Sequence, residues 1–168
     1  MPRAQVLRKG KSAKKATGSP ERQLDSFLDK FTPEIAAEAR EALRRMRARL
    51  PGAVELVYDN YNALAIGFGP SERTSEAIFS IALFPRWVSL FFLLSGTRLR
   101  DPDCYLEGGG NKVRHIKLDC GAMLGDPGVQ ELMAQALELA PKAIDAAGPR
   151  RLIIKSVAEK QRPRWPGR

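Results

Sequence analysis

Histidine and cysteine are scarce in this 168-residue sequence, which contains one histidine and two cysteines. Cys104 and Cys120 match neither a disulfide framework nor a paired CxxC metal site, and no apolar signal segment follows the basic N-terminus. A reducing, cytoplasmic setting is therefore expected. The sequence also lacks a complete catalytic arrangement of side chains, so it favours a protein without enzymatic activity, and we assign no catalytic residue.

An uninterrupted apolar segment of the length that crosses a membrane is also missing. Residues 77–94 come closest, but Pro85 and Arg86 divide them. A charged residue beside a helix breaker is costly in lipid. We therefore expect two strands joined by a tight turn and no membrane partner.

Acidic residues are absent from the first 20 positions, which hold six cations, and residues 148–168 hold seven cations and one acid. These two ends together carry +12, whereas the whole chain carries +9, so residues 21–147 carry −3. A nucleic-acid-binding domain usually places its cations on the folded surface that contacts phosphate. We interpret the basic ends as solubilising tails, with weak, salt-dependent binding of nucleic acid through the tails as the alternative.

One domain is predicted, because a chain of 168 residues with 43% hydrophobic composition can bury a single core. Residues 1–18 are rich in Lys, Arg, Ala and Gly without an apolar period, so they are predicted to form a disordered basic tail. The domain is predicted to span residues 19–158. Residues 159–168 are predicted to form a second basic tail, rich in proline and arginine.

Helix and strand signals are separated along the chain. Ser19–Pro20, Thr32–Pro33 and Asp126–Pro127 each combine an N-cap residue with a proline in the first turn of a helix. From Val54 the apolar period changes to about two, which predicts strands. The grouping predicts an α+β fold: an antiparallel sheet of about five to six strands, covered by two N-terminal helices and one C-terminal helix. The predicted strands span residues 54–59, 62–68, 76–84, 87–94, 112–118 and 152–157.

The second predicted helix is rich in arginine. Its arginines lie mostly off the apolar stripe, and Glu38 and Glu41 are interleaved with them. This pattern predicts a solvated, partly salt-bridged helix face rather than a nucleic-acid site. The arginines concerned are Arg40, Arg44, Arg45 and Arg47.

The strongest candidate site is a glycine-rich loop and the strand after it. The loop has neither the GxxxxGK[ST] spacing of a P-loop nor the following helix of a dinucleotide fingerprint. Free backbone N–H groups beside cations predict a site for a phosphate or carboxylate. The alternative is a flexible hairpin loop before an edge strand whose cations oppose aggregation. The candidate ligand-binding residues are Gly108, Gly109, Gly110, Asn111, Lys112 and Arg114.

His115 and two tyrosines are secondary candidates. Strand alternation places His115 on the opposite face from Lys112 and Arg114, so the cations cannot all converge. His115 is either a hydrogen-bonded structural residue or a base or metal ligand. Tyr58 and Tyr61 either line a pocket or flank an Asx-type turn. Metal ligation by His115 would need partners from the mixed oxygen and sulfur set Asp101, Asp103, Cys104, Glu107, Asp119 and Cys120, which no standard spacing selects.

Three short motifs in residues 21–120 resemble the YdhG-like family of small bacterial domains, which is catalogued as of unknown function. They are the runs Tyr58–Leu64, Phe84–Leu90 and Leu106–Ile116. The resemblance implies a compact α+β fold and a cytoplasmic setting. Some relatives carry a frataxin-like iron-chaperone label, which implies iron held by surface acids. Frataxin-type binding uses an acidic helical ridge, whereas the N-terminal helices predicted here are rich in arginine.

The sequence therefore predicts a small non-enzymatic binding module. Its expected partner is a small anionic ligand or a protein that binds near the glycine-rich loop. No cofactor is predicted from the residues, and the ligands of any metal stay unassigned. Iron or other metal handling is the first alternative, and nucleic-acid binding through the basic tails is the second.

Overall fold

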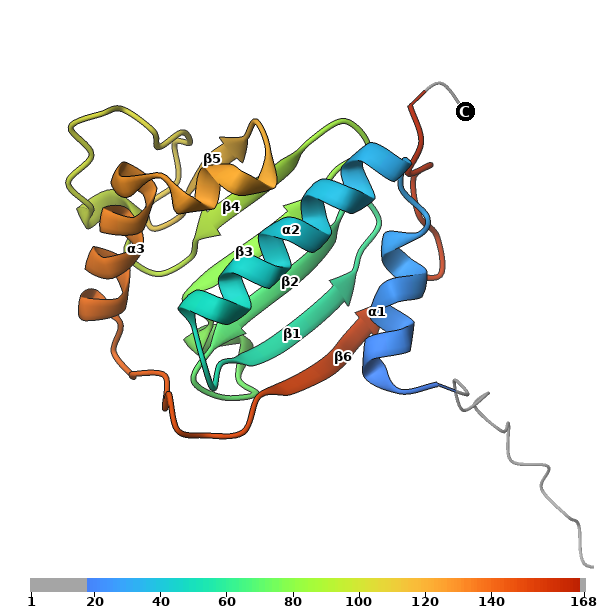
Figure 1. Ribbon diagram of the computed structural model, residues 1–168, viewed down its shortest axis with the longest axis horizontal. Helices are drawn as coiled ribbons and strands as arrows, with labels where there is room; N and C mark the ends of the chain where they lie inside the picture. The colour runs from blue at the N-terminus through green and yellow to red at the C-terminus, as the bar shows by residue number, and fades with distance from the viewer. Residues whose placement is uncertain (1–17, 167–168) are drawn as a thin grey trace, which may run out of the picture.

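The computed structural model describes residues 18–166 and folds them into three α-helices and one six-stranded sheet (Figure 1). The tail predicted for residues 1–18 lies almost wholly outside the described residues. The α-helices are α1 (Pro20–Leu28), α2 (Pro33–Arg49) and α3 (Pro127–Leu139). The strands are β1 (Val54–Asp59), β2 (Leu64–Gly69), β3 (Phe79–Leu83), β4 (Val88–Phe92), β5 (Arg114–Leu118) and β6 (Arg151–Val157). Three short 3-10 helices are η1 (Thr74–Glu76), η2 (Gly96–Arg98) and η3 (Gly121–Gly125).

Local signals set the starts of the helices. The Ser19 hydroxyl accepts a hydrogen bond from the backbone N–H of Arg22, and the Thr32 hydroxyl accepts one from that of Ile35. Both predicted N-caps are confirmed. Asp126 stands at the N-cap of α3, but its side chain makes no capping hydrogen bond.

The sheet is mixed, so the prediction of an antiparallel sheet is wrong for one strand. The strand order is β5-β4-β3-β2-β1-β6, and β6 runs parallel to β1, with Val57 opposite Ile154. The other neighbouring pairs are antiparallel. The chain reaches β6 through α3 and residues 140–150, which carry it from the β5 edge to the opposite edge. Such a crossover, unlike a tight turn, permits parallel pairing. The predicted α+β class is confirmed.

One face of the sheet and the helices form a common core. In Figure 1, α2 crosses the middle strands and α1 lies beside the β6 edge. Leu24 of α1, Met46 of α2 and Leu132 of α3 are buried in one cluster with Ile66 and Ile81 of the sheet. The predicted helical cover is confirmed for this face. Within residues 18–166, no helix has the length and apolar character needed to cross a membrane.

The opposite face of the sheet is partly covered by the loop that contains η1. A side chain at Gly67 would meet the Ala77 Cβ at 3.7 Å, so the loop lies directly on β2. The Tyr58 hydroxyl shares a hydrogen bond with the Thr74 hydroxyl. Small side chains and this loop bury the side of the central strands that faces away from the three α-helices.

Two buried carboxylates point from β1 into the helical face. Glu55 is 1% exposed and Asp59 is fully buried. The Glu55 Oε1 lies 2.8 Å from the Arg47 Nε, and its Oε2 lies 2.7 Å from the Arg150 Nε. Buried charges are tolerated only when they are paired, so these contacts fix α2 and the start of β6 against β1.

The second carboxylate holds the C-terminal segment in place. The Asp59 carboxylate lies 2.7 Å from the Lys30 Nζ and 2.9 Å from the Arg164 Nη2. Arg164 is 5% exposed, and its guanidinium lies 5.4 Å from the centre of the Phe31 ring. The segment predicted as a tail from residue 159 therefore lies against the domain as far as residue 166.

The arginine-rich face of α2 forms the predicted ion pairs. Arg44 and Arg45 both hydrogen-bond to Glu41, and Arg40 pairs with Asp29. The pattern departs from the prediction only at Arg47, which reaches the buried Glu55. The hydrogen bonds from Arg44 and Arg45 lower the pKa of Glu41 from 4.5 to about 2.

Replacing Glu41 by glutamine is expected to remove a pH-dependent part of the stability. A carboxyl group whose pKa is lowered on folding stabilises the protein above its unfolded value and loses that effect as the pH falls through the folded value. The free energy of unfolding, measured with urea, should therefore be lower for Glu41→Gln than for the original protein at neutral pH. This difference in free energy should shrink as the pH falls from 4.5 to about 2. Added salt should reduce the difference, because the pair is exposed. Glu131→Gln on α3, an exposed residue without an ion pair in the described chain, is the control; an equal pH profile for both variants would contradict the assignment.

Candidate functional site

The glycine-rich loop lies at the surface before β5, and its neighbouring arginine is already engaged. Gly109 has no atom within 4 Å of the position of a side chain, so the loop tip is open. The Arg114 Nη1 donates hydrogen bonds to the carbonyl groups of Gly110 and Val113. Arg114 therefore binds carbonyl groups of its own loop. The predicted anion site stays a prediction.

Two further predicted ligand residues, Asn111 and Lys112, tie the loop to η2. The Gly96 N–H donates to the Lys112 carbonyl at 2.7 Å, and the Thr97 hydroxyl donates to the Asn111 carbonyl at 3.1 Å. These bonds use backbone atoms, so the side chains of Asn111 and Lys112 stay exposed. The two cavities described below, of about 320 Å³ and about 590 Å³, are lined by other segments.

His115 lies on the other face of β5 from Arg114, as strand alternation predicts. Its ring stacks on Phe91 with 5.1 Å between ring centres, and its Nε2 lies 3.5 Å from the Glu107 Oε2. Glu107 and His115 also exchange two backbone hydrogen bonds. His115 therefore packs against Phe91 and contacts Glu107 at the edge strand of the sheet.

The two tyrosines lie in different surroundings. Tyr58 contacts Thr74 on the loop-covered face, whereas Tyr61 is 50% exposed and lies under the guanidinium of Arg162 at 5.6 Å. Tyr61 lies in the turn that is closed by a bond from the Asn60 N–H to the Ala63 carbonyl. The structure does not bring them to one pocket.

The residues considered for metal binding stay apart. Cys104 and Cys120 are both exposed and free. Among residues 18–166, no three His, Cys, Asp or Glu side chains come together in an arrangement that could hold a metal ion.

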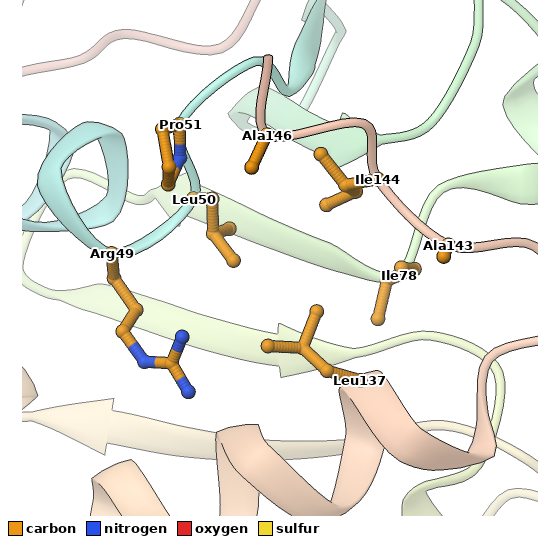
Figure 2. Close-up of a pocket in the computed structure, with 8 residues that line it drawn as sticks. All are labelled: Arg49, Leu50, Pro51, Ile78, Leu137, Ala143, Ile144 and Ala146. Atoms are coloured by element: carbon orange, nitrogen blue, oxygen red, sulfur yellow. The ribbon is translucent and has the colours of Figure 1, made fainter. Parts of the chain in front are cut away.

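An apolar pocket that the sequence did not reveal lies where the end of α2 meets β3, α3 and the segment after α3. Its volume is about 320 Å³. Figure 2 shows the side chains of Leu50, Ile78 and Leu137 directed toward a common space, with the Arg49 guanidinium at its edge. We call it the Arg49 pocket. It is lined by Arg49, Leu50, Pro51, Ile78, Leu137, Ala143, Ile144 and Ala146.

A tight approach of two backbone segments forms one wall of this pocket. Gly52 has φ +78°, and a Cβ there would lie 2.0 Å from the Asp145 carbonyl oxygen. Asp145 in turn closes a turn, because its side chain and carbonyl accept the N–H groups of Ala147 and Gly148. A side chain at residue 52 would therefore collide with the backbone of the segment that carries Ile144 and Ala146 into the pocket.

The charge at the pocket edge has no anionic partner in the structure. The Arg49 Nε donates to the Gln130 Oε1 at 3.0 Å, and the Gln130 amide donates to the Leu124 carbonyl. Arg49 forms no ion pair with any residue from 18 to 166. A neutral amide therefore orients a guanidinium whose charge is free to bind a carboxylate or phosphate.

Sequence reasoning missed the pocket because its parts are dispersed. Leu50 and Leu137 lie on the apolar sides of α2 and α3, and Pro51 and Gly52 follow the end of α2, so none of these local patterns indicates a cavity. The usable signal was Ala143–Ile144, an apolar pair in a segment with no regular structure.

Comparisons with known proteins do not extend these observations. No protein-family model matches the sequence, and searches of curated proteins and of solved structures gave no significant match. Membership of the YdhG-like family therefore stays a prediction.

Proposed function

We propose that this protein is a binding module for a small, largely apolar molecule that carries one anionic group, held in the Arg49 pocket. The single observation behind this proposal is the unpaired guanidinium of Arg49 at the edge of an otherwise apolar cavity. The predicted ligand class, a small anion, is retained. The site differs from the predicted glycine-rich loop.

The dimensions and lining of the pocket favour a compact ligand. Its volume of about 320 Å³ lies at the small end of the usual range for ligand sites. The apolar walls supply affinity by burial, and a bidentate bond from the guanidinium to a carboxylate supplies orientation. Medium-chain fatty acids and aryl carboxylates combine these properties.

The chemistry of the lining supports binding rather than catalysis. Arg49 is the only charged residue among those that line the pocket, and none of them is a nucleophile or a general base. Arginine stays protonated near neutral pH, so its role is to bind charge.

Titration calorimetry with octanoate tests the proposal, with 1-octanol as the uncharged comparison. Arg49→Gln is expected to weaken octanoate binding roughly ten- to hundredfold, because a charge-assisted hydrogen bond contributes about 1.5–3 kcal/mol. The same substitution should change octanol binding little. Ala143→Trp, which fills the cavity without removing the charge, should weaken both ligands.

Arg22→Gln on α1 provides a matched control, since it removes an exposed arginine outside the pocket. It should bind octanoate like the original protein. Equal octanoate affinity in Arg49→Gln and Arg22→Gln would rule out the pocket, as would the absence of binding to the original protein.

A further inference from the structure

A second cavity, separate from the Arg49 pocket, lies between the β3–β4 turn and the C-terminal segment. It has a volume of about 590 Å³. Two tryptophans and two arginines contribute to its lining, together with three prolines. We call it the tryptophan groove. Its lining residues are Asn62, Phe84, Pro85, Arg86, Trp87, Arg162, Pro163, Trp165 and Pro166.

The Asp59–Arg164 pair builds one wall of the groove. Arg164 is buried, so it fixes Pro163 and Trp165 on either side of it. The Arg162 N–H donates to the Tyr61 carbonyl at 2.9 Å, which adds a second attachment. These two attachments hold the C-terminal segment against the domain, so the shape of the groove is defined by the fold.

Aromatic rings and cations lie close together in the groove and beside it. Phe84 and Trp87 are stacked, with ring centres 4.8 Å apart and planes 20° apart. The Lys117 Nζ lies 5.3 Å from the Trp87 ring, and the Arg162 guanidinium lies over Tyr61. Trp165 keeps 38% of its surface exposed. Flat rings beside positive charge can stack on bases and also neutralise phosphates.

The charge of the groove selects an anionic partner. Arg86 and Arg162 line it, no acidic residue does, and neither arginine forms an ion pair with a residue in the described part of the chain. The nearest buried acid, Asp59, is already paired with Lys30 and Arg164.

We propose that the tryptophan groove binds single-stranded nucleic acid, with bases against its aromatic rings and phosphates on Arg86 and Arg162. Bases in a duplex are stacked on each other and cannot reach aromatic side chains, so a single strand fits this surface better. This site is independent of the proposed ligand pocket. It also differs from binding through solvated tails, because Arg162 and Trp165 of the C-terminal segment form one surface with Phe84 and Trp87 of the folded domain.

Fluorescence anisotropy with a labelled oligonucleotide of about 12 nucleotides tests the proposal on the full chain. Trp165→Ala should weaken binding about five- to hundredfold, whereas Trp165→Phe, which keeps a flat ring, should retain most of the affinity. The double variant Arg86→Gln/Arg162→Gln should lower the slope of log affinity against log salt by roughly 1.4. Arg98→Gln in η2, beyond the opposite end of β4, is the control and should bind like the original protein.

These variants separate the groove from other anion-binding surfaces. If the N-terminal basic tail, residues 1–18, alone binds the oligonucleotide, all groove variants keep the original affinity, and the proposal is wrong. The absence of oligonucleotide binding would overturn it as well, and so would loss of binding to anionic vesicles in Trp165→Ala while oligonucleotide affinity is unchanged. Circular dichroism of each variant confirms that the comparison is made between folded proteins.

Discussion

Asp59→Asn is expected to lower the free energy of unfolding by roughly 3–5 kcal/mol, the usual effect of removing one partner of a buried ion pair. The carboxylate is fully buried and forms ion pairs with both Lys30 and Arg164. Asparagine keeps the shape but removes the charge, so the buried guanidinium of Arg164 loses its only anionic partner in the described structure. Urea unfolding monitored by far-UV circular dichroism measures the change.

Two further variants show whether charge or packing causes the loss. Asp29→Asn removes an acid from an exposed pair with Arg40, and such pairs contribute about 0–1 kcal/mol. The double variant Asp59→Asn/Arg164→Met should recover part of the stability lost in Asp59→Asn, because it also removes the uncompensated buried cation. A loss below about 1 kcal/mol for Asp59→Asn would show that solvent screens the pair.

The Asp59 pair connects stability with the second proposed site. Arg164 is the buried anchor of the segment that contributes Arg162 and Trp165 to the tryptophan groove. Asp59→Asn should therefore disturb oligonucleotide binding even where the domain stays folded. A stability change and a binding change would then arise from one contact.

The sequence predicts well those features that neighbouring residues determine. Ser19 and Thr32 cap helices through bonds to the third residue after them, so a local pattern is sufficient. The tight turn at Pro85–Arg86 joins two antiparallel strands for the same reason. The partner of β6 depends on where a long crossover returns to the sheet, and no local pattern contains that information.

Buried charge was the least predictable part of the fold. Glu55 and Asp59 occupy inward positions of β1 on either side of Val57, where alternation alone would predict apolar residues. Their partners Arg150 and Arg164 come from the far end of the chain. A sequence interpretation that assigns the basic C-terminal residues to a solvated tail misses that two of them neutralise buried acids.

The candidate site was not predictable for a similar reason. The glycine-rich loop has cations that are adjacent in sequence, which predicts an anion site, yet Arg114 binds carbonyl groups of the same loop. No local pattern marks Arg49, because the residues that line its pocket come from four separate segments. Proximity in space, not in sequence, creates a binding site.

Gly52→Ala is expected to destabilise the protein by roughly 2–6 kcal/mol, because backbone strain and overpacking each cost about 1–3 kcal/mol. The residue has φ +78°, and the new methyl group would lie 2.0 Å from the Asp145 carbonyl oxygen. Backbone atoms cannot rotate away, so the segment with Ile144 must shift. Octanoate affinity should therefore fall together with stability, which urea unfolding and calorimetry measure on the same variant.

Two substitutions distinguish the reasons for glycine at this position. Gly109→Ala adds the same methyl group where no atom lies within 4 Å, so it should leave both stability and octanoate binding unchanged. Gly52→Asn tolerates the left-handed backbone better than alanine but still places a Cβ against Asp145. If contact with Asp145 dominates, asparagine should be nearly as destabilising as alanine. If asparagine restores stability, only the backbone conformation requires glycine, and Gly52 does not shape the wall of the Arg49 pocket.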